Sequence, residues 1–228
     1  NAAVNTGVTE SDVTAVWSGL RPLVQTSDGE AVKGRTADLS RRHRVTTSPN
    51  GVVTVTGGKL TTYREMSQDA VDAVMQLLGS RRRCSTQRLS LRGSSRFSPT
   101  KNASDLVRHI ESRYGTDANL IYALIESDPH LATALIEGLP YVKAEAIFAV
   151  THEMATTLDD VLSRRTRSRL FDRRATIAQT GEVAALIAPL LNWDETRVAN
   201  ETRAFIDDCA REDAAARVTE EEFINSTE

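Results

Sequence analysis

One stretch of this 228-residue chain, VVTVTGGKLTTYREMSQDAV at residues 52–71, constrains its fold more than any other. Its first residues alternate β-branched side chains, as a strand does, and the alternation stops at a pair of glycines. From Thr61 to Leu78 the apolar residues recur at helical spacing, and Gly79 is placed to end a helix. The stretch therefore predicts a strand that enters a helix through a glycine turn.

A turn of this kind directs backbone N–H groups at a ligand, because the first turn of a helix has unpaired donors and a partial positive charge. Gly57 and Gly58 let the backbone approach closely, and Lys59 adds a full charge. Thr61 or Thr62 is placed to cap the helix and to offer a hydroxyl. The residues predict a site for an anion, or for a group that becomes anionic during reaction. The alternative is a tight turn with a threonine cap and a surface lysine.

Composition excludes several other classes of protein. The net charge of −3 argues for neither nucleic acid nor an anionic membrane as a partner of the whole chain. Cys84 and Cys209 are far apart, so we expect two reduced thiols, no disulfide framework and no metal site. No apolar run approaches the roughly 20 residues that a membrane span needs. The glycines match neither the Walker A spacing nor the G-x-G-x-x-G fingerprint.

The rest of the chain predicts a mixed fold dominated by helices. Residues 15–24 favour a short strand, and HRVTTS and VVTVTG favour two strands joined by a hairpin turn at Asn50-Gly51. From Ser98 onward every segment has helical character, with Ser98 as a candidate N-cap and Pro99 at the first helical position. The fold class expected is α/β followed by all-α.

Three regions follow from this division: 1–79 as the strand-and-helix portion, 80–96 as a linker rich in arginine and serine, and 97–228 as a helical domain. The linker has no interleaved aromatic residues, so a solvated linker is favoured over a nucleic-acid surface. In the helical domain Thr157 is a candidate cap, and WDETR at 193–197 has the acidic character of a helix start.

Further residues of the helical domain invite a functional interpretation. His152 does not head an H-E-x-x-H zinc motif, because position 156 is threonine. We expect His152 and Glu153 to form a structural hydrogen-bonded pair. We expect the three arginines of RRTR to pair mainly with Asp159 and Asp160 and with neighbouring carboxylates; they are Arg164, Arg165 and Arg167.

Four motifs occur in an order that resembles the C-terminal part of the FAD-dependent, aerobic (respiratory) glycerol-3-phosphate dehydrogenases. They are SGLRPLV at 18–24, LSRRHRV at 39–45, the Gly-Gly-Lys stretch, and HEMATTLDDVLSRRTR at 152–167. The resemblance runs over most of the chain, and it implies that the α/β part is the last strands and last helix of a Rossmann-like FAD-binding domain. It implies FAD as cofactor, with Gly57, Gly58, Lys59, Leu60, Thr61 and Thr62 beside the flavin.

The resemblance also implies roles for charged residues. Lys59 would contact the flavin region and substrate oxygens, where charge develops during hydride transfer. Arg21 matches an arginine of the substrate pocket and would orient the C2 hydroxyl or the phosphate of glycerol 3-phosphate. Arg41 matches a second arginine near the substrate, and the adjacent Arg42 is the alternative if the register differs by one. Arg21 and Lys59 are thus the candidate catalytic residues, and no metal is expected.

In its full context the protein is expected to oxidise sn-glycerol 3-phosphate to dihydroxyacetone phosphate and to pass electrons to a membrane quinone. The family places such an enzyme as a peripheral protein on the cytoplasmic face of the inner or plasma membrane, where it is a possible homodimer. The family's Rossmann unit for FAD is absent from these residues, so the chain alone is expected to be colourless and inactive.

A different class of function remains open at this point. The helical domain is alternatively a non-catalytic module for oligomerisation or partner docking. A G-x-G-x-x-G unit encoded ahead of residue 1 would favour the enzyme.

Overall fold

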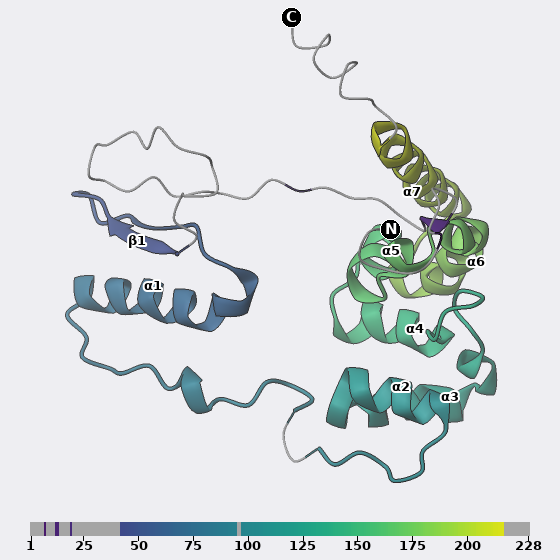
Figure 1. Cartoon of the computed structure of the whole chain (residues 1–228), viewed down its shortest axis with the longest axis horizontal. Helices are drawn as coiled ribbons and strands as arrows, with labels where there is room; N and C mark the ends of the chain where they lie inside the picture. The colour runs from purple at the N-terminus through teal and green to yellow at the C-terminus, as the bar shows by residue number, and fades with distance from the viewer. Residues whose placement is uncertain (1–6, 8–11, 14–18, 20–41, 95–96, 217–228) are drawn as a thin grey trace, which may run out of the picture. The chain divides into compact units, whose positions relative to one another are not determined.

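The computed structural model describes residues 7, 12–13, 19, 42–94 and 97–216, drawn as coloured ribbon in Figure 1. The strand predicted at 15–24 and the candidate substrate arginines Arg21 and Arg41 lie outside the described residues. Contacts divide the chain into two compact units, with a boundary between Leu91 and Arg92. Each unit is described separately below.

The first unit contains a β-hairpin. Strand β1 (Arg44–Thr47) pairs antiparallel with β2 (Val53–Thr56), with Arg44 opposite Thr56 and Thr47 opposite Val53. At the turn the amide of Gly51 donates to the carbonyl of Ser48 (2.9 Å). Gly51 has a φ of 83°, a conformation that glycine adopts without steric cost. The hairpin predicted from Asn50-Gly51 is confirmed.

A short 3-10 turn, η3 (Leu60–Thr62), leads from the hairpin into helix α1 (Tyr63–Leu77), which lies along the hairpin in Figure 1. The helix ends in a Schellman motif. In this motif the amide of Ser80 donates to the carbonyl of Met75 (2.9 Å) and the amide of Gly79 donates to Gln76 (3.1 Å). Gly79 has a φ of 68°, so the predicted helix and its glycine stop are both confirmed.

The second unit is helical. Its helices are α2 (Asp105–Tyr114), α3 (Ala118–Ser127), α4 (Lys143–His152), α5 (Ser168–Phe171), α6 (Arg173–Leu191) and α7 (Glu195–Ala216). Short 3-10 turns η5 (Gly115–Asp117) and η6 (Pro129–Ala132) flank α3, and a π-helical segment, η7 (Asp160–Arg165), precedes α5. Another 3-10 turn, η4 (Thr86–Arg88), belongs to the first unit. The prediction of a helix-dominated fold with a small sheet is confirmed.

The predicted start of the first helix after the linker is wrong. Ser104, not Ser98, is the N-cap of α2, and its Oγ accepts from the amide of Val107 (3.4 Å). The chain from Ser98 cannot enter a helix directly, because Asn102 takes a left-handed φ of 54°. The amide and hydroxyl of Thr100 instead donate to the carboxylate of Glu111 on α2, at 2.8 and 2.5 Å.

Two hydrophobic clusters form the core of the helical unit. One lies among α4, α6 and α7 and the segment before η7, with Leu158, Leu162 and Ile187 fully buried. The other lies among α2, α3 and α4 around Ile110, Ile121 and Phe148. Since α4 contributes to both clusters, it is the central helix of this unit.

A buried carboxylate joins α4 to α2. Glu145 is 1% exposed, and it accepts from the hydroxyl of Tyr114 (2.9 Å) and from the amide of Val142 (2.8 Å). His109 Nε2 lies 3.0 Å from the same carboxylate, and Arg113 Nε lies 3.3 Å from it. Burial and the nearby carboxylate raise the pKa of Tyr114, so its hydroxyl stays protonated and able to donate.

Two buried arginines attach α7 to the preceding helices. Arg169 Nη2 lies 2.7 Å from Asp208 and 2.9 Å from Glu212, and its Nη1 lies 3.2 Å from Asp159. Arg173 pairs with Glu212 (2.6 Å) and with Asp213. Because both guanidinium groups are nearly buried, these carboxylates are needed to compensate their charge.

The predictions for the HEMATT and RRTR motifs are partly correct. Arg164 pairs with Asp159 and Asp160, as expected. His152 stacks on Phe148 and hydrogen-bonds Thr151 (2.7 Å), so the expected pair with Glu153 is wrong. The side chain of His152 faces the helix turn N-terminal to it, as side chains on a helix do.

Arg165 also differs from the expectation, since it donates to the backbone carbonyl of Glu153 at 3.0 and 2.6 Å. The interpretation of Thr157 as a cap is confirmed. Its hydroxyl accepts from the amide of Asp160, and the Asp160 carboxylate accepts from the amide of Thr157, both at 3.1 Å.

The chain enters the helical unit through a close glycine contact. The carbonyl of Gly93 accepts from the amide of Thr116 (2.8 Å), and Arg92 pairs with Asp117 (2.6 Å). A Cβ added to Gly115 would lie 2.0 Å from the Gly93 carbonyl oxygen, where no atom fits. Gly115 also has a φ of 55°. Both the space and the backbone conformation therefore require glycine here.

We expect Gly115→Ala to lower the free energy of unfolding by about 3 kcal/mol, since it adds a backbone clash to the strain of a positive φ. Gly138→Ala is the matched control, because Gly138 has a φ of 80° but open space around its Cβ position. The control should cost about 1 kcal/mol. Urea unfolding of the two variants measures the difference. Equal losses would show that the Gly93–Gly115 contact is not formed.

Candidate functional site

The candidate site lies at the turn between β2 and α1. Gly57 and Gly58 have φ values of 73° and 92°, so both occupy a region that favours glycine. A Cβ on Gly58 would lie 2.5 Å from Met66 Sδ and 3.1 Å from His43 Cβ. Gly58 therefore lets the end of the strand pack closely against α1, and the approach of the two glycines to a ligand stays a prediction.

Lys59 is the residue at which the chain turns into the helix. Its backbone is extended (φ −134°, ψ 151°), and its carbonyl accepts from the amide and the hydroxyl of Thr62, at 3.0 and 3.1 Å. The amides of Leu60 and Thr61 precede the first hydrogen bond of the turn, so they have no intrahelical partner. These two donors and the Lys59 side chain are the cationic and hydrogen-bonding groups that the turn offers to a ligand.

Thr62 lies at the N-cap position of α1, as predicted, but its side chain does not form the expected cap hydrogen bond. The hydroxyl of Thr62 donates to the Lys59 carbonyl and does not accept from a helix amide, and Thr61 is exposed and makes no side-chain cap either. The 3-10 turn explains this, because it brings the Thr62 side chain back over the carbonyl three residues earlier. The first amides of the helix are thereby left available.

A cavity of about 610 Å³ opens beside the turn. Among the described residues it is lined by Arg42, His43, Lys59, Thr62, Glu65 and Asp69. The structure thus brings Lys59 and Thr62 to one cavity, and it adds Arg42, the alternative to Arg41 in the sequence register. Two cationic side chains and two carboxylates line the same space, which suits a ligand that has both an anionic group and hydroxyls.

His43 and Asp69 are residues of this cavity that the sequence reasoning missed. His43 Nε2 lies 2.7 Å from Asp69 Oδ2, and this contact ties the start of β1 to the second turn of α1. A signal was present in the sequence, because Thr62, Glu65 and Asp69 are spaced as i, i+3 and i+7 and so share one helix face. His43 also supports the turn, since its Cβ limits the space at Gly58.

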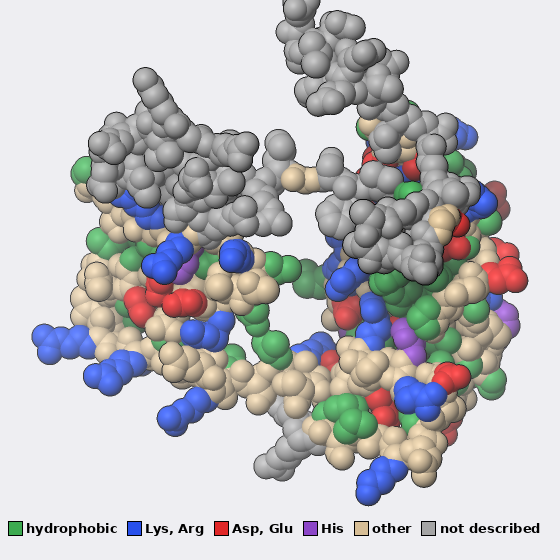
Figure 2. Space-filling model, in the orientation of Figure 1, with side chains coloured by type: hydrophobic (Ala, Val, Ile, Leu, Met, Phe, Trp, Pro, Cys, Tyr) green, Lys and Arg blue, Asp and Glu red, His purple; other side chains and the backbone are tan. Residues whose placement is uncertain are grey.

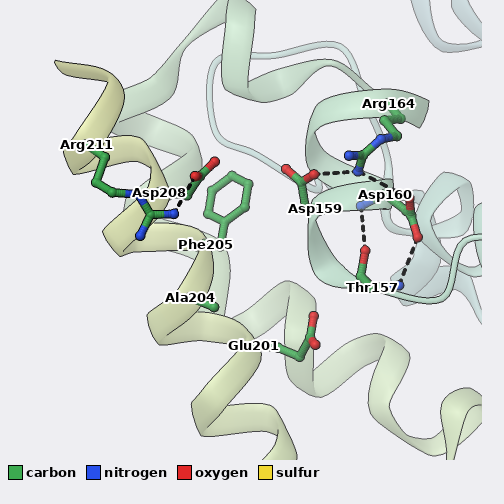
Figure 3. Close-up of a pocket in the computed structure, with 9 residues that line it drawn as sticks. All are labelled: Thr157, Asp159, Asp160, Arg164, Glu201, Ala204, Phe205, Asp208 and Arg211. Atoms are coloured by element: carbon green, nitrogen blue, oxygen red, sulfur yellow. Dashed lines mark hydrogen bonds and ion pairs between the residues drawn. The ribbon is translucent and has the colours of Figure 1, made fainter. Parts of the chain in front are cut away.

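A second cavity, of about 510 Å³, lies in the helical unit (Figure 3). It is lined by Thr157, Asp159, Asp160 and Arg164 from the η7 region and by Glu201, Ala204, Phe205, Asp208 and Arg211 from α7. Its carboxylates already have partners in the chain: for example, Glu201 accepts from the amide of Leu158 (3.0 Å). This cavity is therefore a junction between helices. Across the described ranges, no group of three or more His, Cys, Asp or Glu residues could hold a metal ion.

The pKa of the Asp208 carboxyl at this junction is lowered from its ordinary value of 3.8 by hydrogen bonds from Arg169 and Arg211, while partial burial opposes the shift. The ionised carboxylate therefore stabilises the fold above the unfolded pKa, and this stabilisation is lost as pH falls through the lower folded pKa.

We expect Asp208→Asn to lower the free energy of unfolding at neutral pH by less than about 1 kcal/mol, because the carboxylate is partly exposed. The difference from the unmodified protein should vanish as pH falls below the folded pKa. Asp207→Asn, at the exposed neighbouring position, should show neither effect. Urea unfolding at a series of pH values tests this. A difference that persists at low pH would indicate lost packing and not a lost ion pair.

Comparison with known proteins gives the class of this chain. A sequence model described as the C-terminal domain of alpha-glycerophosphate oxidase matches residues 70–198, more than half of the chain. The chain therefore belongs to this family. The matched region begins within α1 and ends within α7, so it includes the buried Glu145 cluster and the HEMATT and RRTR motifs.

Three individual proteins are similar to this chain in sequence. Glycerol-3-phosphate dehydrogenase 2 of Mycobacterium tuberculosis is 33% identical over 218 residues, which is 90% of this chain and 36% of that protein. Glycerol-3-phosphate dehydrogenase 1 of the same organism is 39% identical over 176 residues, covering 76% and 34%. A probable mitochondrial glycerol-3-phosphate dehydrogenase of Dictyostelium discoideum is 32% identical over 214 residues, covering 87% and 33%. The chain thus spans about a third of each relative's length.

A solved structure shows a similar fold. The crystal structure of the glycerol-3-phosphate dehydrogenase from Bacillus halodurans, complexed with FAD, superimposes with a TM-score of 0.58 and 21% sequence identity. The likeness covers 73% of this chain and 36% of that one. At this identity the comparison supports the fold and goes no further.

Proposed function

We propose that this chain is part of an FAD-dependent glycerol-3-phosphate dehydrogenase that oxidises sn-glycerol 3-phosphate to dihydroxyacetone phosphate. The strand–Gly57-Gly58-Lys59–helix turn carries the proposal, because Lys59 lines a cavity and the amides of the next two residues have no intrahelical partner. The relatives with glycerol-3-phosphate dehydrogenase names and the FAD-bound structural neighbour support it.

The residues present fit a flavin at this turn. The amides of Leu60 and Thr61 lack intrahelical partners, and the glycines leave no Cβ on the approach to them. FAD, when bound, supplies the acceptor for the hydride that leaves C2 of the substrate. The two amides and the positive end of η3 and α1 would hold the flavin edge at which negative charge collects.

Lys59 would serve both the flavin and the substrate. It lies at the mouth of the helix and lines the cavity together with Arg42. A lysine ammonium is a compact charge that stabilises a developing negative charge without giving up its proton. Arg21 and Arg41, predicted to bind the substrate, would complete the anion site with planar, bidentate donors.

The enzyme would pass its electrons to a membrane quinone and act as a peripheral protein on the cytoplasmic face of the membrane. No helix in the described ranges is long and apolar enough to cross a bilayer.

Lys59→Ala in the full-length protein should lower kcat for glycerol 3-phosphate by about 10²- to 10³-fold while flavin content changes little, as for the loss of one oxyanion-hole donor. The lysine acts on charge that grows during the reaction, so its loss affects the barrier more than binding of the cofactor. Lys101→Ala, on an exposed turn of the helical unit, is the control and should leave kcat unchanged. Near-normal turnover of Lys59→Ala would show that Lys59 is a surface residue of the turn with no role in the reaction.

Arg21→Lys should lower kcat/KM strongly although the charge is kept, because an ammonium cannot reproduce the bidentate geometry of a guanidinium. Steady-state kinetics and the melting temperature are measured together. Kinetics close to those of the unmodified enzyme would contradict a role in the substrate pocket. A large fall in melting temperature would instead identify Arg21 as a structural ion pair.

A further inference from the structure

The end of α1 and the chain after it carry arginines and leucines but no acidic residue. The sequence from 77 to 91 is LLGSRRRCSTQRLSL. Its four arginines, Arg81, Arg82, Arg83 and Arg88, are all exposed. Its four leucines are also exposed, at 53% for Leu77, 73% for Leu78, 71% for Leu89 and 63% for Leu91. We call these eight residues the Arg–Leu strip.

The strip is fixed to the first unit by local bonds. The Schellman motif at Gly79 sets the direction in which the chain leaves α1. Arg64 on α1 then donates to the hydroxyl of Thr86 (3.3 Å), which also lies 3.0 Å from Cys84 Sγ. These contacts hold η4, which is followed by Leu89, near the helix.

The charge of the strip is strongly positive. Arg81, Arg82 and Arg83 line a hollow of about 400 Å³ at the end of α1, and Asp72 is the only carboxylate among its described lining residues. Figure 2 shows Lys and Arg side chains projecting along the edge of this unit where residues 78–91 run in Figure 1. The arginine-rich residues 161–171 differ from the strip, because Arg164 and Arg169 pair with carboxylates and Arg165 donates to the carbonyl of Glu153.

Exposed leucines beside arginines suit the interface of a bilayer. Leucine side chains enter the boundary between headgroups and acyl chains, while arginines keep their guanidinium groups among lipid phosphates. A single-stranded nucleic acid would instead require aromatic side chains for its bases, and the strip has none. We propose that the Arg–Leu strip is the lipid-contact surface of this protein and that it selects bilayers rich in anionic lipid.

This inference rests on the membrane attachment in the proposed function and adds the surface and the lipid class. Each arginine near an anionic membrane surface raises the partition coefficient of the protein from water to the membrane by about fivefold. Loss of three arginines should therefore weaken binding by about a hundredfold. Higher salt should weaken the binding of the unmodified protein in the same direction, because the surface charges are screened.

The test measures sedimentation of the full-length protein with vesicles of phosphatidylcholine, with and without phosphatidylglycerol. The triple variant Arg81→Ser, Arg82→Ser, Arg83→Ser should lose binding to the anionic vesicles. The control with the same change of charge is Arg174→Ser, Arg203→Ser, Arg211→Ser, whose arginines are exposed on α6 and α7. Leu89→Ser with Leu91→Ser should also weaken binding, whereas Leu120→Ser with Leu190→Ser, at less exposed leucines of the helical unit, should not.

Oxidation of glycerol 3-phosphate with a soluble electron acceptor is assayed in parallel and should be unchanged in the strip variants. Loss of vesicle binding in these variants alone supports the inference. Equal binding by the strip and control variants overturns it, as does an active enzyme that binds no anionic vesicle. Binding that depends on the arginines but not the leucines, and that RNA competes away, would identify a polyanion site instead. An unmodified protein that binds vesicles but has no activity would contradict only the proposed function.

Discussion

The carboxylate of Glu145 is the interaction on which the helical unit depends. It is fully buried on α4, and its partners come from α2 and from the residue before α4. A charge in this position is tolerated only when it is paired and hydrogen-bonded, so the relative placement of α2 and α4 is tightly constrained. Arg113 extends the constraint, because it also donates to the carbonyl of Arg165 at the end of η7.

This network reaches the HEMATT and RRTR motifs. Arg165 donates in turn to the carbonyl of Glu153. The two arginines thus connect α2, the end of η7 and the residue after α4. Met154 and Arg167, which are neighbours of these residues, have left-handed φ values of 59° and 58°. Side chains with a Cβ adopt that conformation at a cost, and the surrounding hydrogen bonds hold it in place. The HEMATT and RRTR motifs therefore encode the geometry of these loops more than any charge on the surface.

The local parts of the fold could be predicted from the sequence, because their signals are local. Asn50-Gly51 specified the hairpin, and the spacing from Thr61 to Leu78 specified α1 and its glycine stop. Ser98 and Pro99 gave a false helix start, because the left-handed Asn102 and the contact of Thr100 with Glu111 decide that segment. The role of Glu145 could not be predicted, since a glutamate within an alanine-rich helix does not reveal that its side-chain partners on α2 lie more than thirty residues away.

At the candidate site, too, the local features could be predicted from the sequence and the long-range contacts could not. The glycine turn and Lys59 were visible in the sequence because they interrupt a regular pattern. The contribution of His43 and Asp69 was not, because strand and helix must pack before the two meet. The functional assignment itself came from motifs in a particular order. The structure adds a reason for one of them: two glycines with positive φ precede Lys59, which lines a cavity together with Thr62.

The most direct test of this account is a crystal structure of the full-length protein with FAD and glycerol 3-phosphate. The account predicts that the amides of Leu60 and Thr61 lie within hydrogen-bonding distance of the flavin ring, with the Lys59 ammonium between the ring and the substrate. A flavin ring bound away from the Gly57–Thr62 turn, with Lys59 in contact with solvent alone, would contradict it.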